Sequence, residues 1–160
     1  FFLGPLESAV QPGELAVEAF FPAFPARTGT AFVEVSRRHG DYAVCGVAAA
    51  VTVDEAGAVL AARTGYISMG PVPVVLDLTD ATLAGGWQQA ARAAVERLEP
   101  EEDIHAGAAY RGHLAGVLTA RALRQAADLV SPPPKPPSAR RRGPAKKTAA
   151  RRRLDKGDSR

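Results

Sequence analysis

Apolar residues follow a strand-like pattern in the first half of the chain. Four segments, residues 13–22, 30–38, 44–54 and 58–68, are rich in β-branched, aromatic or alternating apolar residues. The segment 44–54 is apolar almost throughout, which favours a strand covered on both faces, although its alanines also permit a helix. Short turns such as residues 54–57 join the segments, so the pattern predicts an antiparallel sheet of three to four strands.

The spacing of apolar residues changes to a helical repeat after Pro71 and Pro73. We expect three helices, over residues 78–85, 86–98 and about 108–129. The core-facing positions would be Trp87, Ala91, Ala94, Val95 and Leu98 in the second helix, and Tyr110, Leu114, Val117, Leu118 and Leu129 in the third. Strands followed by helices predict the α+β class, with three helices packed on one face of the sheet.

The charge of the chain is divided between two regions. Residues 131–160 carry eleven basic and two acidic residues, a net 11 − 2 = +9, whereas residues 1–130 carry nine and fifteen, a net 9 − 15 = −6. The basic region begins SPPPKPP and holds few apolar residues, so we predict a disordered, Pro-rich basic tail. Such a tail either binds nucleic acid or an acidic partner, or is only a solvated extension. No aromatic residue interleaves its charges, which makes nucleic acid the less favoured partner.

Other features of the composition indicate a domain of a cytoplasmic protein. The single Cys45 cannot form an internal disulfide, which favours a reducing compartment. No apolar run approaches the roughly 20 residues that a membrane-spanning helix needs. The chain opens with FFLGPLESAV, which is neither an initiator Met nor a secretory signal, so we expect the C-terminal piece of a longer protein.

The segment EEDIHAGAAYRGH, residues 101–113, raises the question of a metal or acid–base site. Three carboxylates precede His105, and His113 lies eight residues further on. That spacing does not place both imidazoles on one helical face as i, i+4 metal ligands. Carboxylates just before a helix start favour the positive end of its dipole. The segment is therefore interpreted as structural, and no metal ligand or catalytic residue is predicted.

Several segments, in the same order along the chain, resemble one family. SRRHGDYAVCGVAA (residues 36–49), DIHA (103–106) and FFLGP (1–5) followed by PGELAVEAFFP (12–22) are similar to the FAD-binding medium subunit of the molybdenum hydroxylases, such as carbon monoxide dehydrogenase and xanthine dehydrogenase. The closing signature continues through Ala109-Tyr110-Arg111, His113-Leu114, Val117-Leu118-Thr119 and Arg121-Ala122-Leu123. The resemblance covers roughly residues 1–127 and is to the C-terminal domain of that subunit.

The resemblance implies a role within a larger oxidoreductase. Residues 1–19 would be the exit segment from an upstream FAD domain, residues 20–130 the C-terminal-like domain, and residues 131–160 the tail. The upstream domain would hold FAD through glycine-rich loops that this chain lacks. The implied partners are that domain, an iron–sulfur small subunit and a large subunit with the molybdenum cofactor. The domain would help to position FAD for electron transfer from the iron–sulfur clusters to an acceptor. The alternative is a non-catalytic interaction module that acts through its basic tail.

The resemblance also suggests which residues approach the flavin. Backbone groups around Leu15 and Ala16 would pass near the isoalloxazine, and the strand with Val33 and Glu34 would lead past the cofactor. Relatives often place a lysine in that strand, so its charge-assisted contact is absent here. The group Arg37, Arg38 and Asp41 forms either a surface ion pair of little energetic value or a clamp between domains.

Overall fold

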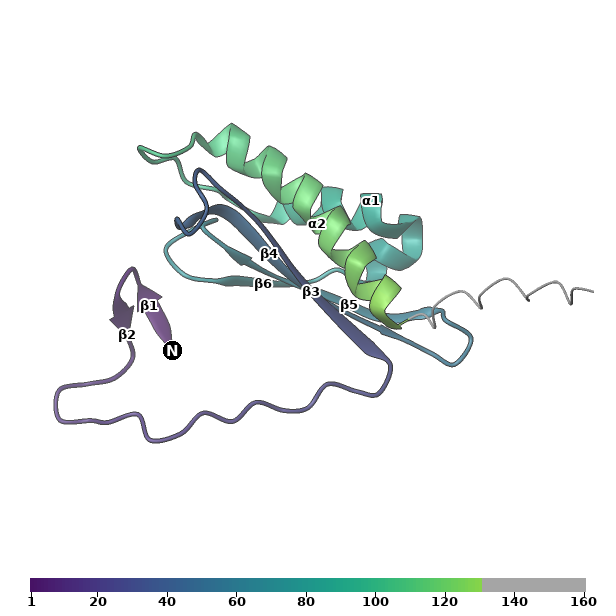
Figure 1. Cartoon of the computed structure of the whole chain (residues 1–160), viewed down its shortest axis with the longest axis horizontal. Helices are drawn as coiled ribbons and strands as arrows, with labels where there is room; N and C mark the ends of the chain where they lie inside the picture. The colour runs from purple at the N-terminus through teal and green to yellow at the C-terminus, as the bar shows by residue number, and fades with distance from the viewer. Residues whose placement is uncertain (131–160) are drawn as a thin grey trace, which may run out of the picture.

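The computed structural model describes residues 1–130, which form one sheet, a small separate hairpin and two helices (Figure 1). The elements are β1 (Phe2–Gly4), β2 (Glu7–Ser8), β3 (Thr28–Ser36), β4 (Ala43–Val53), β5 (Val59–Ile67), β6 (Val74–Asp77), α1 (Thr79–Arg97) and α2 (Ala108–Val130). The sheet is antiparallel with the order β3-β4-β5-β6, and β1 pairs with β2 alone. The α+β class and an antiparallel sheet of three to four strands are confirmed, although the fourth strand of the sheet is β6, which was not among the predicted strands. The predicted disordered tail lies outside the described residues.

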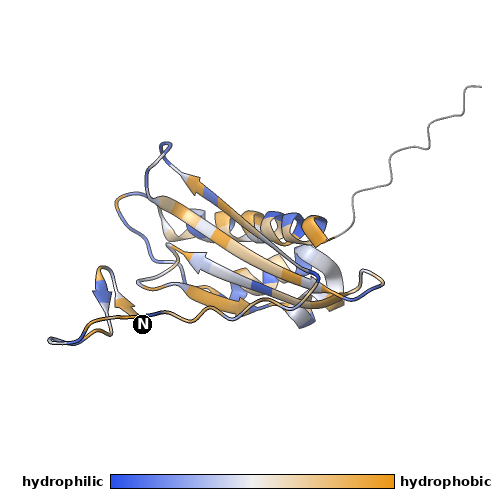
Figure 2. Cartoon of the chain, turned by 60° about the horizontal axis from the view of Figure 1, so that its bottom comes forward, coloured by the Kyte–Doolittle hydropathy of each residue, from blue (hydrophilic) through white to orange (hydrophobic). Residues whose placement is uncertain are grey.

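Both helices cover the same face of the sheet, and the core lies between these two layers (Figure 2). Strand β4 supplies Val47 and Val51, which are fully buried. The hydroxyl of Tyr66 on β5 lies 2.8 Å from that of Thr119 on α2, so a buried hydrogen bond joins the two layers. At Gly29 an added Cβ would lie 2.0 Å from the Ala126 carbonyl oxygen, so the close approach of β3 and α2 requires glycine.

The opposite face of the sheet is left open by the described residues, and we call it the open face. Glycine and alanine form its centre, where Phe32 pairs with Ala48 and Gly46 pairs with Ile67 across the strands. Phe32 is 55% exposed and Val75 is 73% exposed. Residues 44–54 form the predicted strand, which within residues 1–130 is covered on one face only. The run is nearly continuously apolar because three of its open-face positions, Gly46, Ala48 and Ala50, are small apolar residues.

Two predicted elements differ in the structure. The segment 13–22 is not a strand: residues 14–25 have no regular secondary structure, and no strand within residues 1–130 pairs with them. The first two predicted helices are the two arms of the single helix α1, interrupted at Gly85 and Gly86, where Gly86 has a φ of 68°. Both glycines have non-helical backbone angles, so the helical path is broken between the two arms. The break falls at the predicted boundary between the first two helices, although the two arms together carry the single label α1.

The buried face of α2 is rotated from the predicted one. Leu114 and Leu118 are buried as expected, but Tyr110 is 52%, Val117 43% and Leu129 71% exposed. The face that contacts the sheet is completed by Ala115, Ala122, Leu123 and Ala126. Alanine is common on both buried and exposed helix faces, so the prediction rested on the larger apolar residues. Several of these lie at the edge of the buried face, and the predicted face was therefore rotated toward them.

Candidate functional site

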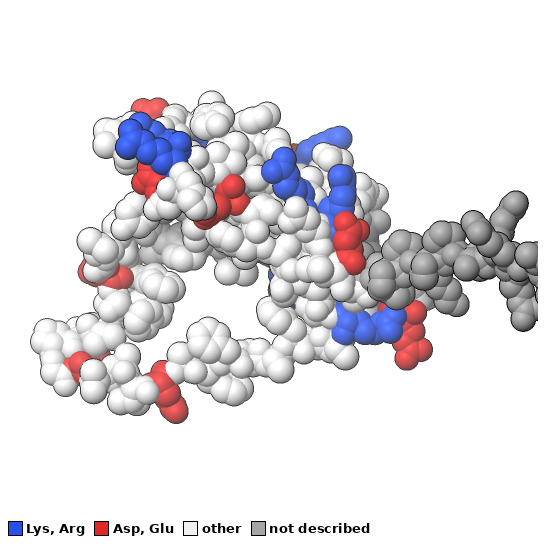
Figure 3. Space-filling model, in the orientation of Figure 1, with Lys and Arg blue, Asp and Glu red and all other residues white. Residues whose placement is uncertain are grey.

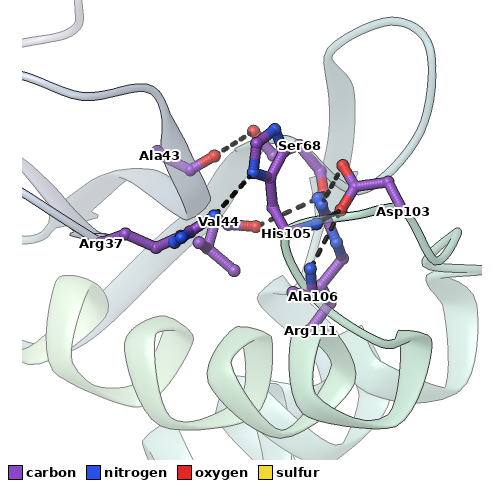
Figure 4. A network of polar contacts seen from close by, with 8 residues as sticks. All are labelled: Arg37, Ala43, Val44, Ser68, Asp103, His105, Ala106 and Arg111. Atoms are coloured by element: carbon purple, nitrogen blue, oxygen red, sulfur yellow. Dashed lines mark hydrogen bonds and ion pairs between the residues drawn. The ribbon is translucent and has the colours of Figure 1, made fainter.

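The candidate site is organised by Arg111, a buried arginine at the start of α2. Its Nη1 donates hydrogen bonds to the carbonyl oxygens of Val44 (3.2 Å) and Ser68 (2.5 Å). Its Nη2 lies 2.6 Å from Oδ2 of Asp103. The residue is 6% exposed, and its guanidinium thus ties together the start of β4, the end of β5 and the loop before α2 (Figure 4). The planar, multiply donating guanidinium is suited to such a junction.

Asp103 shapes the loop in front of α2. Its Oδ1 accepts hydrogen bonds from the backbone N–H groups of His105 (2.8 Å) and Ala106 (3.0 Å). The backbone hydrogen bond from His105, followed by the contact with Arg111, lowers the pKa of Asp103 from 3.8 to about 2. The carboxylate therefore caps a turn and pairs with an arginine, whereas the sequence analysis placed it at the helix dipole.

The loop also brings His105 to the end of β3. Nη1 of Arg37 lies 3.0 Å from Nδ1 of His105. A guanidinium can only donate, so Nδ1 accepts, and the neutral imidazole in this arrangement carries its proton on Nε2. Arg37 and His105 are separated by 68 positions in sequence, so this contact joins the β3–β4 turn to the loop between α1 and α2.

A pocket of about 510 Å³ lies over this network, and we call it the network pocket. Its lining includes Pro5 from the N-terminal hairpin, and Arg37, Asp41 and Tyr42 from the β3–β4 turn. Glu101, Glu102 and Asp103, from the loop before α2, also line it. Tyr42 is 95% exposed at the edge of this pocket. The lining carries both positive and negative side chains. Such a mixture is better suited to contact with another polar surface than to binding a single small ion.

Metal and thiol chemistry find no support within residues 1–130. This part of the chain holds no group of three His, Cys, Asp or Glu side chains placed to bind a metal ion. His105 contacts Arg37, and His113 lies on the outer surface of α2. Burial raises the pKa of the Cys45 thiol to about 11, which keeps the sulfur protonated and unreactive near neutral pH.

The predicted site residues fall in different surroundings. Leu15 and Ala16 lie exposed on the extended segment before β3. Val33 packs against the core, whereas Glu34 lies on the open face, so the two side chains point to opposite sides of the sheet. The structure therefore does not bring these four residues into one cluster.

The predicted clamp residues lie together at the β3–β4 turn. Arg37 and Asp41 both line the network pocket, and Arg38 is exposed beside them. The ion pairs within residues 1–130 are Arg63 with Asp77 and Arg111 with Asp103. The surface ion pair between Asp41 and the neighbouring arginines is thus not formed.

Sequence reasoning missed Arg111, the residue that holds the site together. The helical spacing does place Arg111 on the same face as Leu114 and Leu118, which predicts that its side chain is buried. A buried guanidinium without a partner would be costly. A nearby acidic partner was therefore required, and Asp103 lies eight positions upstream.

These features define a class of protein: a small α+β domain whose sheet, within residues 1–130, has helices on one face and a mixed-charge pocket at one end. Neither helix within residues 1–130 has the length and hydropathy that a bilayer span requires. A sequence model of the family described as "CO dehydrogenase flavoprotein C-terminal domain" matches residues 30–126. The chain belongs to this family, as its resemblance predicted.

Known relatives are oxidoreductase subunits. The chain is 38% identical to the 6-hydroxypseudooxynicotine dehydrogenase complex subunit alpha of Paenarthrobacter nicotinovorans, over 78% of this chain and 44% of the relative. It is 32% identical to the carbon monoxide dehydrogenase medium chain of Hydrogenophaga pseudoflava, over 79% and 46%. A solved carbon monoxide dehydrogenase from that organism superposes with a TM-score of 0.65 and 34% identity, over 79% of this chain and 46% of the other. The chain spans about half the length of these relatives.

Proposed function

We propose that this chain is the C-terminal domain of the FAD-carrying subunit of a molybdenum-dependent hydroxylase or dehydrogenase. In that role it closes over an upstream FAD domain and helps to position FAD for electron transfer from iron–sulfur clusters to an acceptor. Those clusters and the molybdenum cofactor would belong to a small and a large partner subunit. The domain boundaries follow the same proposal, with an exit segment over residues 1–19 and the domain proper over residues 20–130.

One observation carries this proposal: three segments that are far apart in sequence and carry the family resemblance meet at the network pocket. The segment FFLGP contributes Pro5, and SRRHGDYA contributes Arg37 and Tyr42. The closing signature contributes Asp103 and Arg111. Convergence of these segments on one exposed end of the sheet supports a shared contact surface, because the buried core alone does not require Pro5 or Tyr42 there.

The character of the pocket limits what part of FAD this domain would contact. Its volume falls within the range of roughly 300–1000 Å³ for ligand pockets. Its carboxylates, among them Asp41 and Glu101, would repel a diphosphate, so the surface fits a neutral ring edge or a polar protein surface. The upstream domain would therefore bind the FAD pyrophosphate, and this domain would complete the enclosure.

Individual residues take roles within this proposal. Backbone groups at Leu15 and Ala16 lie on an exposed extended segment that is accessible to the cofactor domain. Glu34 on the open face is placed for contact, whereas Val33 would contribute only through its backbone because its side chain packs in the core. Arg37, Arg38 and Asp41 would form the clamp between domains, with Arg37 already oriented by His105.

Reconstitution of the split subunit tests the proposal. The full chain alone should purify colourless, because a site divided between two domains lacks its phosphate-binding half. Mixing it with the upstream half of the Hydrogenophaga pseudoflava medium chain should increase FAD retention, measured from flavin absorbance after gel filtration. Arg38→Glu should weaken this gain at least several-fold, and Arg124→Glu, which makes the same charge change on the outer surface of α2, serves as the control.

Two outcomes would count against the proposal. Stoichiometric FAD binding by the chain alone would place the cofactor site within residues 1–160 rather than between domains. Flavin retention that is unchanged by the chain would leave the alternative, an interaction module that acts through its basic tail.

A further inference from the structure

A groove runs between α1 and α2 on the side of the helix layer that faces away from the sheet. We call it the α1–α2 groove, and its volume is about 1020 Å³. Its floor consists of small residues: Ala91 and Ala120 are buried, and Gly112 and Gly116 expose the backbone of α2. The helices approach each other closely at Gly116, where an added Cβ would lie 3.3 Å from Cγ2 of Val95. The groove is thus an apolar channel set into the outer surface.

The charge around the α1–α2 groove is opposite to that of the domain. Residues 1–130 contain nine arginines and fifteen carboxylate residues. Three of those arginines, Arg92, Arg121 and Arg124, line the groove, against the single carboxylate of Glu96. None of the three takes part in an ion pair within residues 1–130. Arginine side chains also gather over the helix layer in the space-filling view (Figure 3). An acidic domain therefore carries a locally basic, apolar-floored channel.

We propose that the α1–α2 groove binds an acidic amphipathic helix from a partner protein. The lining residues of α2 run from Ala109 to Gln125, a length of about 24 Å at 1.5 Å per residue, which matches a helix of about four turns. Small floor residues allow a third helix to approach to the usual interaxial distance of roughly 8–10 Å. Carboxylates flanking the apolar stripe of that helix would pair with the arginines, in the helix-in-groove mode of recognition.

Charge also favours a partner helix over two other possible occupants of the groove, the basic tail of this chain and a second copy of the chain. Residues 131–160 carry a net charge of +9, the same sign as the arginines, so the tail does not complement the groove. A second copy of the chain would present the same arginines around its own groove. An acidic helix from another protein satisfies both the small apolar floor and the basic margin, and it does so without using the network pocket or the open face.

A selection experiment tests this assignment with defined probes. A display library of amphipathic 16-residue helices, randomised on one face and its flanks, is selected on the full chain and counter-selected on Arg121→Glu. Enriched peptides should carry Asp or Glu beside Ala, Val or Leu at i, i+4 and i+7. In fluorescence anisotropy they should bind Arg121→Glu and Arg124→Glu at least ten-fold more weakly than the wild-type chain. Arg63→Glu has the same charge change on the open face and should bind as the wild type does.

The location of binding is checked separately, because the basic tail also attracts acidic peptides. In ¹⁵N-labelled chain the amide signals of Gly112 and Gly116 should shift on peptide addition, and that of Gly65 on the open face should not. Peptides without acidic flanks, equal weakening by Arg63→Glu, or shifts away from the α1–α2 groove would overturn the proposal. A wild-type dimer that Arg121→Glu dissociates would instead assign the groove to a second copy. Circular dichroism of each variant establishes that it is folded.

Discussion

Replacing Arg111 by methionine should destabilise the domain more than any exposed arginine substitution. The change removes the donor to the carbonyl oxygens of Val44, which is buried, and Ser68, which is partly buried, and leaves both acceptors without this partner. Hydrogen bonds that involve a charged group contribute about 1.5–3 kcal/mol each. The gain from no longer burying a guanidinium offsets part of this, since its Nε has no hydrogen-bond partner within residues 1–130. We therefore expect a net loss of roughly 2–4 kcal/mol of unfolding free energy.

The measurement is urea unfolding of the full chain followed by circular dichroism, with the slope of the transition compared between proteins. A loss of this size corresponds to a decrease in melting temperature on the order of 10 °C for a domain of this length. Arg124→Met, an exposed substitution on the same helix, should change stability by less than about 0.5 kcal/mol. A value for Arg111→Met equal to that of Arg124→Met would refute the idea that this arginine holds the sheet end and the loop together.

Two further predictions address the same fold. The pKa of Asp103 is lower in the folded state, about 2 against an ordinary 3.8, so its stabilising effect is present above about pH 4 and is lost as the pH falls through 2. In Asp103→Asn the urea concentration at the unfolding midpoint should therefore fall less between pH 4 and pH 2 than it does in the wild type. The same fall in both proteins would contradict the assigned contact. Gly29→Ala places a Cβ 2.0 Å from the Ala126 carbonyl and should lower the melting temperature markedly; Gly70→Ala, with open space around it, is the control, and equal effects would show that β3 and α2 are not in close contact.

The sequence predicted the sheet well because three of its strands, β3, β4 and β5, carry dense β-branched and aromatic residues between short turns. It predicted a strand over residues 13–22 for the same reason, although a strand also needs a partner that local pattern does not reveal. The boundary predicted at Gly85 and Gly86 coincides with the break in α1, because a glycine pair interrupts a helix locally without help from tertiary contacts. The outer groove and the open face could not be predicted, because periodicity says which residues are apolar but not which of them another element will cover.

The site was predicted only in part, for a related reason. The segments that carry the family resemblance pointed to Arg37, Arg38 and Asp41, and two of these line the network pocket. The contact between Arg37 and His105 depends on how the loop before α2 folds back across the sheet end. Asp103 determines that fold through backbone hydrogen bonds, and its pairing with Arg111 is visible only once both elements are in place.

The contact between β3 and α2 has a consequence for how the domain acquires its structure during synthesis. The strands pair in sequence order, so each hairpin can form as soon as its second strand leaves the ribosome. The first strand, however, packs at Gly29 against Ala126, near the end of the last helix. An emerging chain therefore holds a sheet with one apolar face bare until almost all of residues 1–130 have been translated. The helix layer can cover this face only after residue 126 has emerged, so a chain that ends before that point is expected to be prone to aggregation.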